Sequence, residues 1–108
     1  MNTYTTNIFK DIYGAWIARS TIMISKRYTA VIITSQRNAN CPVISDGSMI
    51  YCEGTPAMKV SPLGRLDTHY YDNRKRRLNK RMIEKHHAAA LSSANHYMPA
   101  IRKMYAPN

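Results

Sequence analysis

The change in residue usage near Gly64 is the sequence feature that most constrains the fold of this chain. Residues 1–64 are rich in Thr, Ile, Val and Tyr and carry six cations and three anions, whereas residues 65–108 are rich in Arg, Lys, Ala and His and carry ten cations and three anions. β-branched and aromatic side chains favour strands, while Ala, Arg and Lys favour helices. Because 108 residues suffice for one core, we predict a single small basic α+β domain over residues 1–108.

The first part predicts a small antiparallel β-sheet over residues 12–52. Its strands are expected near residues 12–18, 21–25, 28–35, 43–45 and 48–52. Residues 25–28 are expected to turn one hairpin, and residues 36–40 to form a polar loop. Trp16, together with Phe9, Tyr13 and Ile17, is expected in the core.

The dipeptide Asp46-Gly47, flanked by strand-forming residues, predicts a two-residue hairpin turn. Pairing outward from this turn places Cys41 opposite Cys52, with their Cα atoms about 5.5 Å apart. Such a distance permits a disulfide. Because no secretory signal is present, we expect two reduced and mostly buried thiols. Two thiols are also too few for a four-ligand zinc site.

The second part predicts a long basic helix over residues 73–91, capped by Asp72, and a short C-terminal helix over residues 99–105. Pro99 suits the first turn of that second helix. At 100° per residue, the apolar residues of the long helix form one stripe. The stripe consists of Leu78, Met82, Ile83, His86, Ala89 and Ala90.

The segment from Arg74 to Lys85 packs seven cations and one anion into 12 residues. Like charges at i, i+4 repel one another, and a polyanion would relieve this repulsion. Arg predominates, and its planar guanidinium matches phosphate oxygens. The predicted contact residues are Arg74, Lys75, Arg76, Arg77, Lys80, Arg81 and Lys85, with Arg102 and Lys103 as possible extensions of the patch. A solvated, solubilising helix face is the alternative interpretation of the same residues.

These features favour a non-catalytic nucleic-acid-associated protein, for instance a component of a ribonucleoprotein particle, that contacts backbone phosphates through its basic helix. The competing hypothesis is a small phage or mobile-element protein that inhibits a host nucleic-acid-processing or defence enzyme by binding an acidic surface. Binding to generic polyanions separates the two hypotheses. The sequence leaves DNA versus RNA and the oligomeric state open.

The sequence lacks the motifs that indicate catalysis, cofactor binding or metal binding. There is no Gly-rich phosphate loop, no nucleophile elbow and no Cys/His motif, so we predict no enzyme activity, no cofactor and no metal site. His86 and His87 are adjacent and cannot chelate one ion on a helix, so one histidine is expected on the packed face and the others at the surface. With no apolar run near the roughly 20 residues of a membrane span and no hydrophobic signal core, we expect a cytoplasmic protein without a membrane partner.

Overall fold

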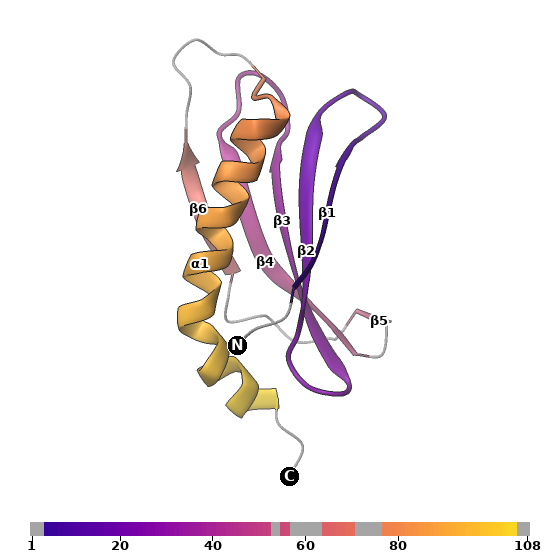
Figure 1. Ribbon diagram of the computed structural model, residues 1–108, viewed down its shortest axis with the longest axis vertical. Coiled ribbons are helices and arrows are strands. Elements are labelled where there is room, and N and C mark those ends of the chain that lie inside the picture. Colours follow the sequence, from indigo (N-terminus) through magenta and orange to yellow (C-terminus); the bar gives the residue numbers. More distant parts are fainter. Residues whose placement is uncertain (1–3, 53–54, 57–63, 71–76, 106–108) are drawn as a thin grey trace.

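A six-stranded antiparallel sheet carries one long helix across one of its faces (Figure 1). The computed structural model describes residues 4–52, 55–56, 64–70 and 77–105. The strands are β1 (Tyr4–Lys10), β2 (Trp16–Met23), β3 (Tyr28–Gln36), β4 (Val43–Cys52), β5 (Thr55–Pro56) and β6 (Gly64–Tyr70), and the helix is α1 (Lys80–Tyr105). Strands β1 to β5 follow one another in the sheet, and β6 pairs with β4. The predicted α+β class with an antiparallel sheet is confirmed.

The turn between β1 and β2 occupies residues that the sequence assigned to a strand. Asp11 Oδ1 accepts hydrogen bonds from the backbone N–H groups of Tyr13 and Ala15 at 2.8 and 2.9 Å. The Asp11 N–H donates to the carbonyl of Ala15 at 2.9 Å, and Gly14 has a φ of 81°. A strand ends where an aspartate side chain accepts a hydrogen bond from the backbone N–H two residues later and a glycine at positive φ follows. The strand predicted at residues 12–18 is therefore wrong at residues 12–15, and β1 is an additional strand before it.

The hairpin predicted at residues 25–28 is confirmed. The N–H groups of Ile24 and Ser25 both donate to the carbonyl of Tyr28, at 2.9 and 3.2 Å. The residues on either side form β2 and β3, which are paired from Met23 with Thr29 to Ala18 with Thr34. The two short strands expected near residues 12–18 and 21–25 are thus replaced by the continuous strand β2.

The hairpin predicted at Asp46-Gly47 is wrong, because β4 runs straight through this dipeptide. Asp46 pairs with Ile33 and Met49 with Val31, so two residues of β4 lie opposite Ile32 in a β-bulge. Pairing with β3 on one side and β6 on the other keeps the dipeptide extended. The ten residues of β4 therefore place its two ends about 30 Å apart. Cys41 and Cys52 lie near opposite ends, and both are free and partly exposed.

A single helix replaces the two predicted helices. Asn79 caps it: the Met82 N–H donates to Asn79 Oδ1 at 3.0 Å, and residues 77–79 are not helical. The predicted cap Asp72 lies outside the described residues. At the other end, α1 continues through exposed Pro99, because its neighbours Met98 and Ile101 are buried against the sheet. Burial of these two side chains offsets the hydrogen bond that proline cannot make.

The buried face of α1 is turned by about a quarter of a circle from the predicted stripe. Ile83, His87, Ala90, Ala94, Met98 and Ile101 are buried. Ala89 is exposed and His86 is partly exposed. Among the histidines whose side chains are described, His87 is thus the one on the packed face.

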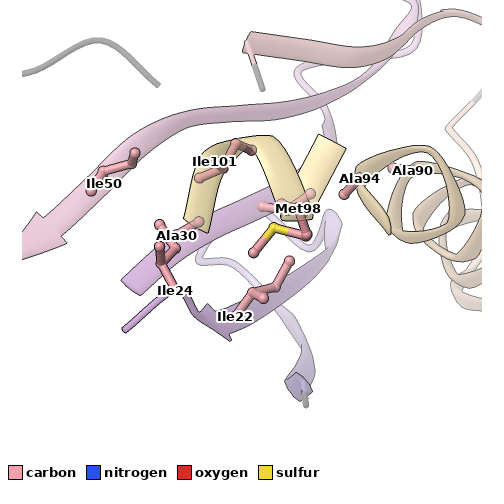
Figure 2. Packing of buried hydrophobic residues seen from close by; sticks show 9 residues of the cluster. Ile22, Ile24, Ala30, Ile50, Ala90, Ala94, Met98 and Ile101 are labelled. Carbon is pink, nitrogen blue, oxygen red and sulfur yellow. The ribbon is translucent and has the colours of Figure 1, made fainter. Parts of the chain in front are cut away.

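The interface of α1 with the sheet contains two apolar clusters. The larger one joins Ile22, Ile24, Ala30, Ile32 and Ile50 of the sheet region to Ala90, Ala94, Met98 and Ile101 of α1 (Figure 2). The smaller one lies at the start of α1 and contains Ala18, Val43, Leu78 and Ile83, with Trp16 packed against it. Trp16 is thus partly core, whereas Phe9 and Tyr13 are exposed, contrary to the expectation. In the part of the chain that the structure describes, no helix has the length and apolar character needed to cross a membrane.

Candidate functional site

Two lysines from distant parts of the chain contact the same tryptophan ring. Lys10 is the last residue of β1 and pairs with Trp16, the first residue of β2. Its Nζ lies 5.0 Å from the centroid of the Trp16 ring, and the Nζ of Lys80 lies 5.5 Å from the same centroid. Cation–π attraction accounts for both positions. The two ammonium groups are consequently no farther apart than the sum of these two distances, so their repulsion acts mainly at low ionic strength, where the Debye length exceeds this separation.

The start of α1 is anchored to the end of β3. The Leu78 N–H donates to Gln36 Oε1 at 2.8 Å in a buried contact, and the Leu78 side chain joins the smaller apolar cluster. Trp16, Gln36, Arg77 and Leu78 line a small hollow beside this contact, with room for little more than a water molecule. The hollow is too small for a ligand.

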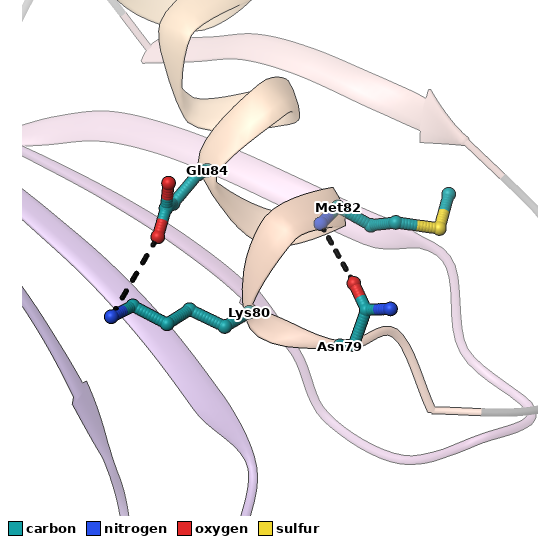
Figure 3. A network of polar contacts seen from close by, with 4 residues as sticks. All are labelled: Asn79, Lys80, Met82 and Glu84. Carbon is teal, nitrogen blue, oxygen red and sulfur yellow. Dashed lines mark hydrogen bonds and ion pairs between the residues drawn. The ribbon is translucent and has the colours of Figure 1, made fainter.

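Arg77, Lys80 and Arg81 precede or begin α1 and are exposed. Together with Lys10 they form a group that we call the basic end, which includes the start of α1 beside the Asn79 cap (Figure 3). The aligned peptide dipoles add positive potential at this place. The basic end therefore combines side-chain cations from two segments with the favourable end of a helix dipole.

Among the carboxylates of the described residues, those of Glu84 and Asp11 lie close to the basic end. Glu84 Oε1 is 4.0 Å from Lys80 Nζ, with both side chains about half exposed (Figure 3). Such an exposed pair contributes little and leaves Lys80 able to exchange partners. Asp11 uses one oxygen to hold the β1–β2 turn. The four cations of the basic end, with Lys85 one helical turn beyond Arg81, outnumber these two anions.

The structure divides the predicted contact residues into three groups. Arg77, Lys80, Arg81 and Lys85 are exposed near the start of α1, and Arg74, Lys75 and Arg76 lie outside the described residues. Arg102 and Lys103 lie near the other end of α1, about 33 Å from Lys80 along the helix axis. Arg102 donates from Nη2 to the carbonyl of Met23 at 3.2 Å. These last two residues therefore do not extend the patch.

Lys10 and Trp16 belong to the site but were missed by the sequence analysis. Both lie far from the basic run in sequence, and only the β1–β2 pairing and the docking of α1 bring them to Lys80. The β-branched and aromatic residues Thr5, Thr6, Ile8 and Phe9 were the available signal for a strand, which here ends in a cation.

A second constellation consists of hydroxyls and one imidazole, and all of its side chains except that of Thr6 are buried. Ser20 Oγ lies 2.6 Å from His87 Nε2, and Thr34 Oγ1 lies 2.7 Å from His87 Nδ1. Thr6 Oγ1 contacts Ser20 Oγ, and Ser45 Oγ contacts Thr34 Oγ1, each at 2.7 Å. We call these five side chains the hydroxyl–imidazole chain. Burial of the imidazole lowers the pKa of His87 below its usual value of 6.5.

A Ser–His pair at hydrogen-bond distance is the arrangement that activates a serine nucleophile. Here, however, Ser20 and Thr34 are fully buried and His87 is 3% exposed, so a substrate has no access to the Ser20 hydroxyl. The other imidazole nitrogen contacts a threonine hydroxyl where a catalytic triad has a carboxylate. We therefore assign the hydroxyl–imidazole chain to the architecture of the helix–sheet interface.

Within residues 4–52, 55–56, 64–70 and 77–105, no three His, Cys, Asp or Glu side chains gather so that they could hold a metal ion. No protein-family model, no curated protein and no solved structure matches this chain.

Proposed function

We propose that this chain binds the phosphate backbone of nucleic acid through the basic end, without catalysing a reaction. The observation that carries the proposal is the convergence of Lys10 and Lys80 on the Trp16 ring. Folding brings like charges together there beside exposed Arg77 and Arg81, and a bound polyanion relieves the repulsion that results.

The composition supports the same proposal. The formal net charge is +10 in 108 residues, which raises the local concentration of any polyanion around the molecule. Phosphate contacts of this kind position a protein without reading bases, so we expect weak sequence preference. The competing proposal is that the same cations bind an acidic protein surface, as in a phage-type inhibitor of a host enzyme.

The test is fluorescence anisotropy of labelled single- and double-stranded DNA and RNA, titrated over a series of salt concentrations. Each neutralised phosphate of a duplex contributes roughly −0.9 to the log–log salt slope, so four to six contacts give a slope of about −4 to −5. We expect micromolar or tighter binding at low salt with such a slope. Absence of binding to every nucleic acid at low salt would overturn the proposal and redirect the search to an acidic protein.

A pair of charge-matched variants locates the binding surface. Arg77→Glu with Arg81→Glu reverses two charges at the basic end, and Lys26→Glu with Lys103→Glu reverses two exposed charges elsewhere. We expect the first variant to lose at least tenfold more affinity than the second at equal salt. Equal losses would show that net charge alone governs binding. Circular dichroism of both variants checks that they remain folded.

A further inference from the structure

The tip of the β1–β2 hairpin, residues 11–15, presents two large apolar side chains to solvent. Ile12 is 89% exposed and Tyr13 is 78% exposed, the highest values among the large hydrophobic residues whose side chains are described. Single exposed apolar residues are common on protein surfaces. Two neighbours at the end of a projecting hairpin form a compact protrusion, which suits insertion between the groups of a partner (Figure 1).

The tip is held in one conformation by its own hydrogen bonds. Asp11 contributes four of them: Oδ1 accepts from Tyr13 and Ala15, its N–H donates to Ala15, and its carbonyl accepts from Gly14 at 3.1 Å. None of these bonds uses the side chain of Ile12 or Tyr13. A pre-ordered loop loses little conformational entropy on binding. The favourable contacts of the two side chains therefore contribute to the affinity without a large cost for ordering the loop.

The tip adjoins the basic end directly. Lys10 immediately precedes the turn and Trp16 immediately follows it, and the two residues pair across the hairpin. Lys80 reaches the same Trp16 ring from α1. A phosphate chain bound by Lys10 and Lys80 would therefore place its neighbouring nucleotides beside Ile12 and Tyr13.

We infer that the hairpin tip contacts the faces of unpaired bases, so that the chain selects single-stranded over double-stranded nucleic acid. The inference rests on the proposed function. A tyrosine ring stacks on a base face, and an isoleucine side chain covers the adjoining apolar surface. Duplex bases already stack on one another and offer no free face, whereas single strands offer every base. The cations bind the phosphate backbone of the nucleic acid, and the tip adds binding free energy that only unpaired bases can provide.

An anionic membrane surface is the other partner that combines negative charge with an apolar layer. Two side chains bury less apolar surface than a single fatty acyl chain, which by itself gives only marginal membrane binding. The Trp16 ring does not enlarge this apolar area, because Lys10 and Lys80 lie over it. The observations therefore favour a nucleic acid over a lipid surface.

The experiment compares a labelled single strand of mixed sequence with a hairpin duplex of equal length. The variant is Ile12→Ser with Tyr13→Ser, and the matched control is Met23→Ser with Met104→Ser, which removes two exposed apolar side chains distant from the tip. We expect the tip variant to lose on the order of tenfold to a hundredfold affinity for the single strand, the range that stacking of one base implies. Its duplex affinity and its salt slope should match those of the control variant.

A 2-aminopurine base in the single strand reports stacking directly. We expect the wild-type protein to change its fluorescence at saturation and the tip variant to leave it nearly unchanged. Equal affinity of the tip and control variants for the single strand, or an equal loss on both nucleic acids, would overturn the inference while leaving the proposed function intact. Absence of all nucleic-acid binding by the wild type would overturn both, and tip-dependent binding to phosphatidylserine vesicles in that case would identify a membrane partner.

Discussion

Two neighbouring regions of the helix–sheet interface differ in chemistry: residues 90–101 of α1 pack on hydrocarbon, whereas His87 packs on hydroxyls. In the first region the buried helix residues are Ala, Met and Ile, packed against isoleucines and an alanine of the sheet region (Figure 2), and Leu91 and Tyr28 pack at its edge. In the second, both nitrogens of His87 contact hydroxyls at 2.6 and 2.7 Å. Both regions are almost fully excluded from water.

The comparison indicates that the apolar region mainly stabilises the fold, whereas the His87 region mainly sets the orientation of α1. Apolar packing stabilises in proportion to the area buried and tolerates small rotations of a helix that presents alanines. Hydrogen bonds at both imidazole nitrogens require one rotation of α1 and one distance from the sheet. The hydroxyl–imidazole chain therefore accounts for why His87, and not His86, lies on the buried face. The predictions below test this division, beginning with the largest expected effect.

Ile32→Ala in the larger apolar cluster should lower the free energy of unfolding by about 3 kcal/mol. Ile32 is fully buried, and truncation of a buried isoleucine removes transfer free energy and leaves a cavity, typically 2–5 kcal/mol in total. Urea denaturation followed by circular dichroism measures the change. Met23→Ala, at a 60% exposed side chain of the neighbouring strand, is the control. A loss as small as that of the control would show that this cluster is not the main source of stability.

Thr34→Val should cost about 2 kcal/mol, although it preserves shape. The change leaves His87 Nδ1 and Ser45 Oγ without the hydroxyl that now contacts both at 2.7 Å, and a buried polar group without its partner costs roughly 1–3 kcal/mol. Thr29→Val, on the same strand but partly exposed, controls for the substitution itself. A neutral Thr34→Val variant would mean that the hydroxyl–imidazole chain could be replaced by hydrocarbon.

The stability of the protein should fall as the pH is lowered below about 6.5, with His87 as one source. Because burial lowers the pKa of His87 in the folded state, the unfolded chain takes up this proton first, and acidification favours unfolding until the folded pKa is passed. One such proton contributes at most about 1.4 kcal/mol per pH unit. His87→Gln should flatten the profile between pH 7 and 5, and His96→Gln, at an exposed residue, should not. Equal profiles for both variants would contradict the assignment.

Asn79→Ala should have the smallest effect, about 1 kcal/mol, through loss of the N-cap bond to Met82. The cost should be local, because the first turn lies away from the larger apolar cluster. Amide hydrogen exchange should accelerate at residues 80–83 and remain unchanged at residues 94–101. Uniform acceleration along α1 would indicate that the helix docks as one unit and that the two regions are not energetically separable.

The sequence by itself determined the class of the fold and the places where pattern and turn chemistry agree. The division near Gly64 predicted a sheet followed by a helix, although strand β6 extends the sheet past this point to Tyr70. Strand β3 and the turn after Ile24 lie where local propensity placed them. The run of cations near the start of α1 could also be identified from the sequence, because charge density depends on composition alone.

Only the tertiary structure decided the features that depend on distant partners. Asp46-Gly47 is a strong local turn signal, yet pairing with β3 and β6 keeps it extended. Pro99 is a local helix breaker, yet buried Met98 and Ile101 hold α1 through it. Lys10 meets Lys80 at Trp16, 70 residues apart, because sheet pairing and helix docking bring them together. Local signals are worth about 1 kcal/mol each, and burial in the core outweighs them wherever the two conflict.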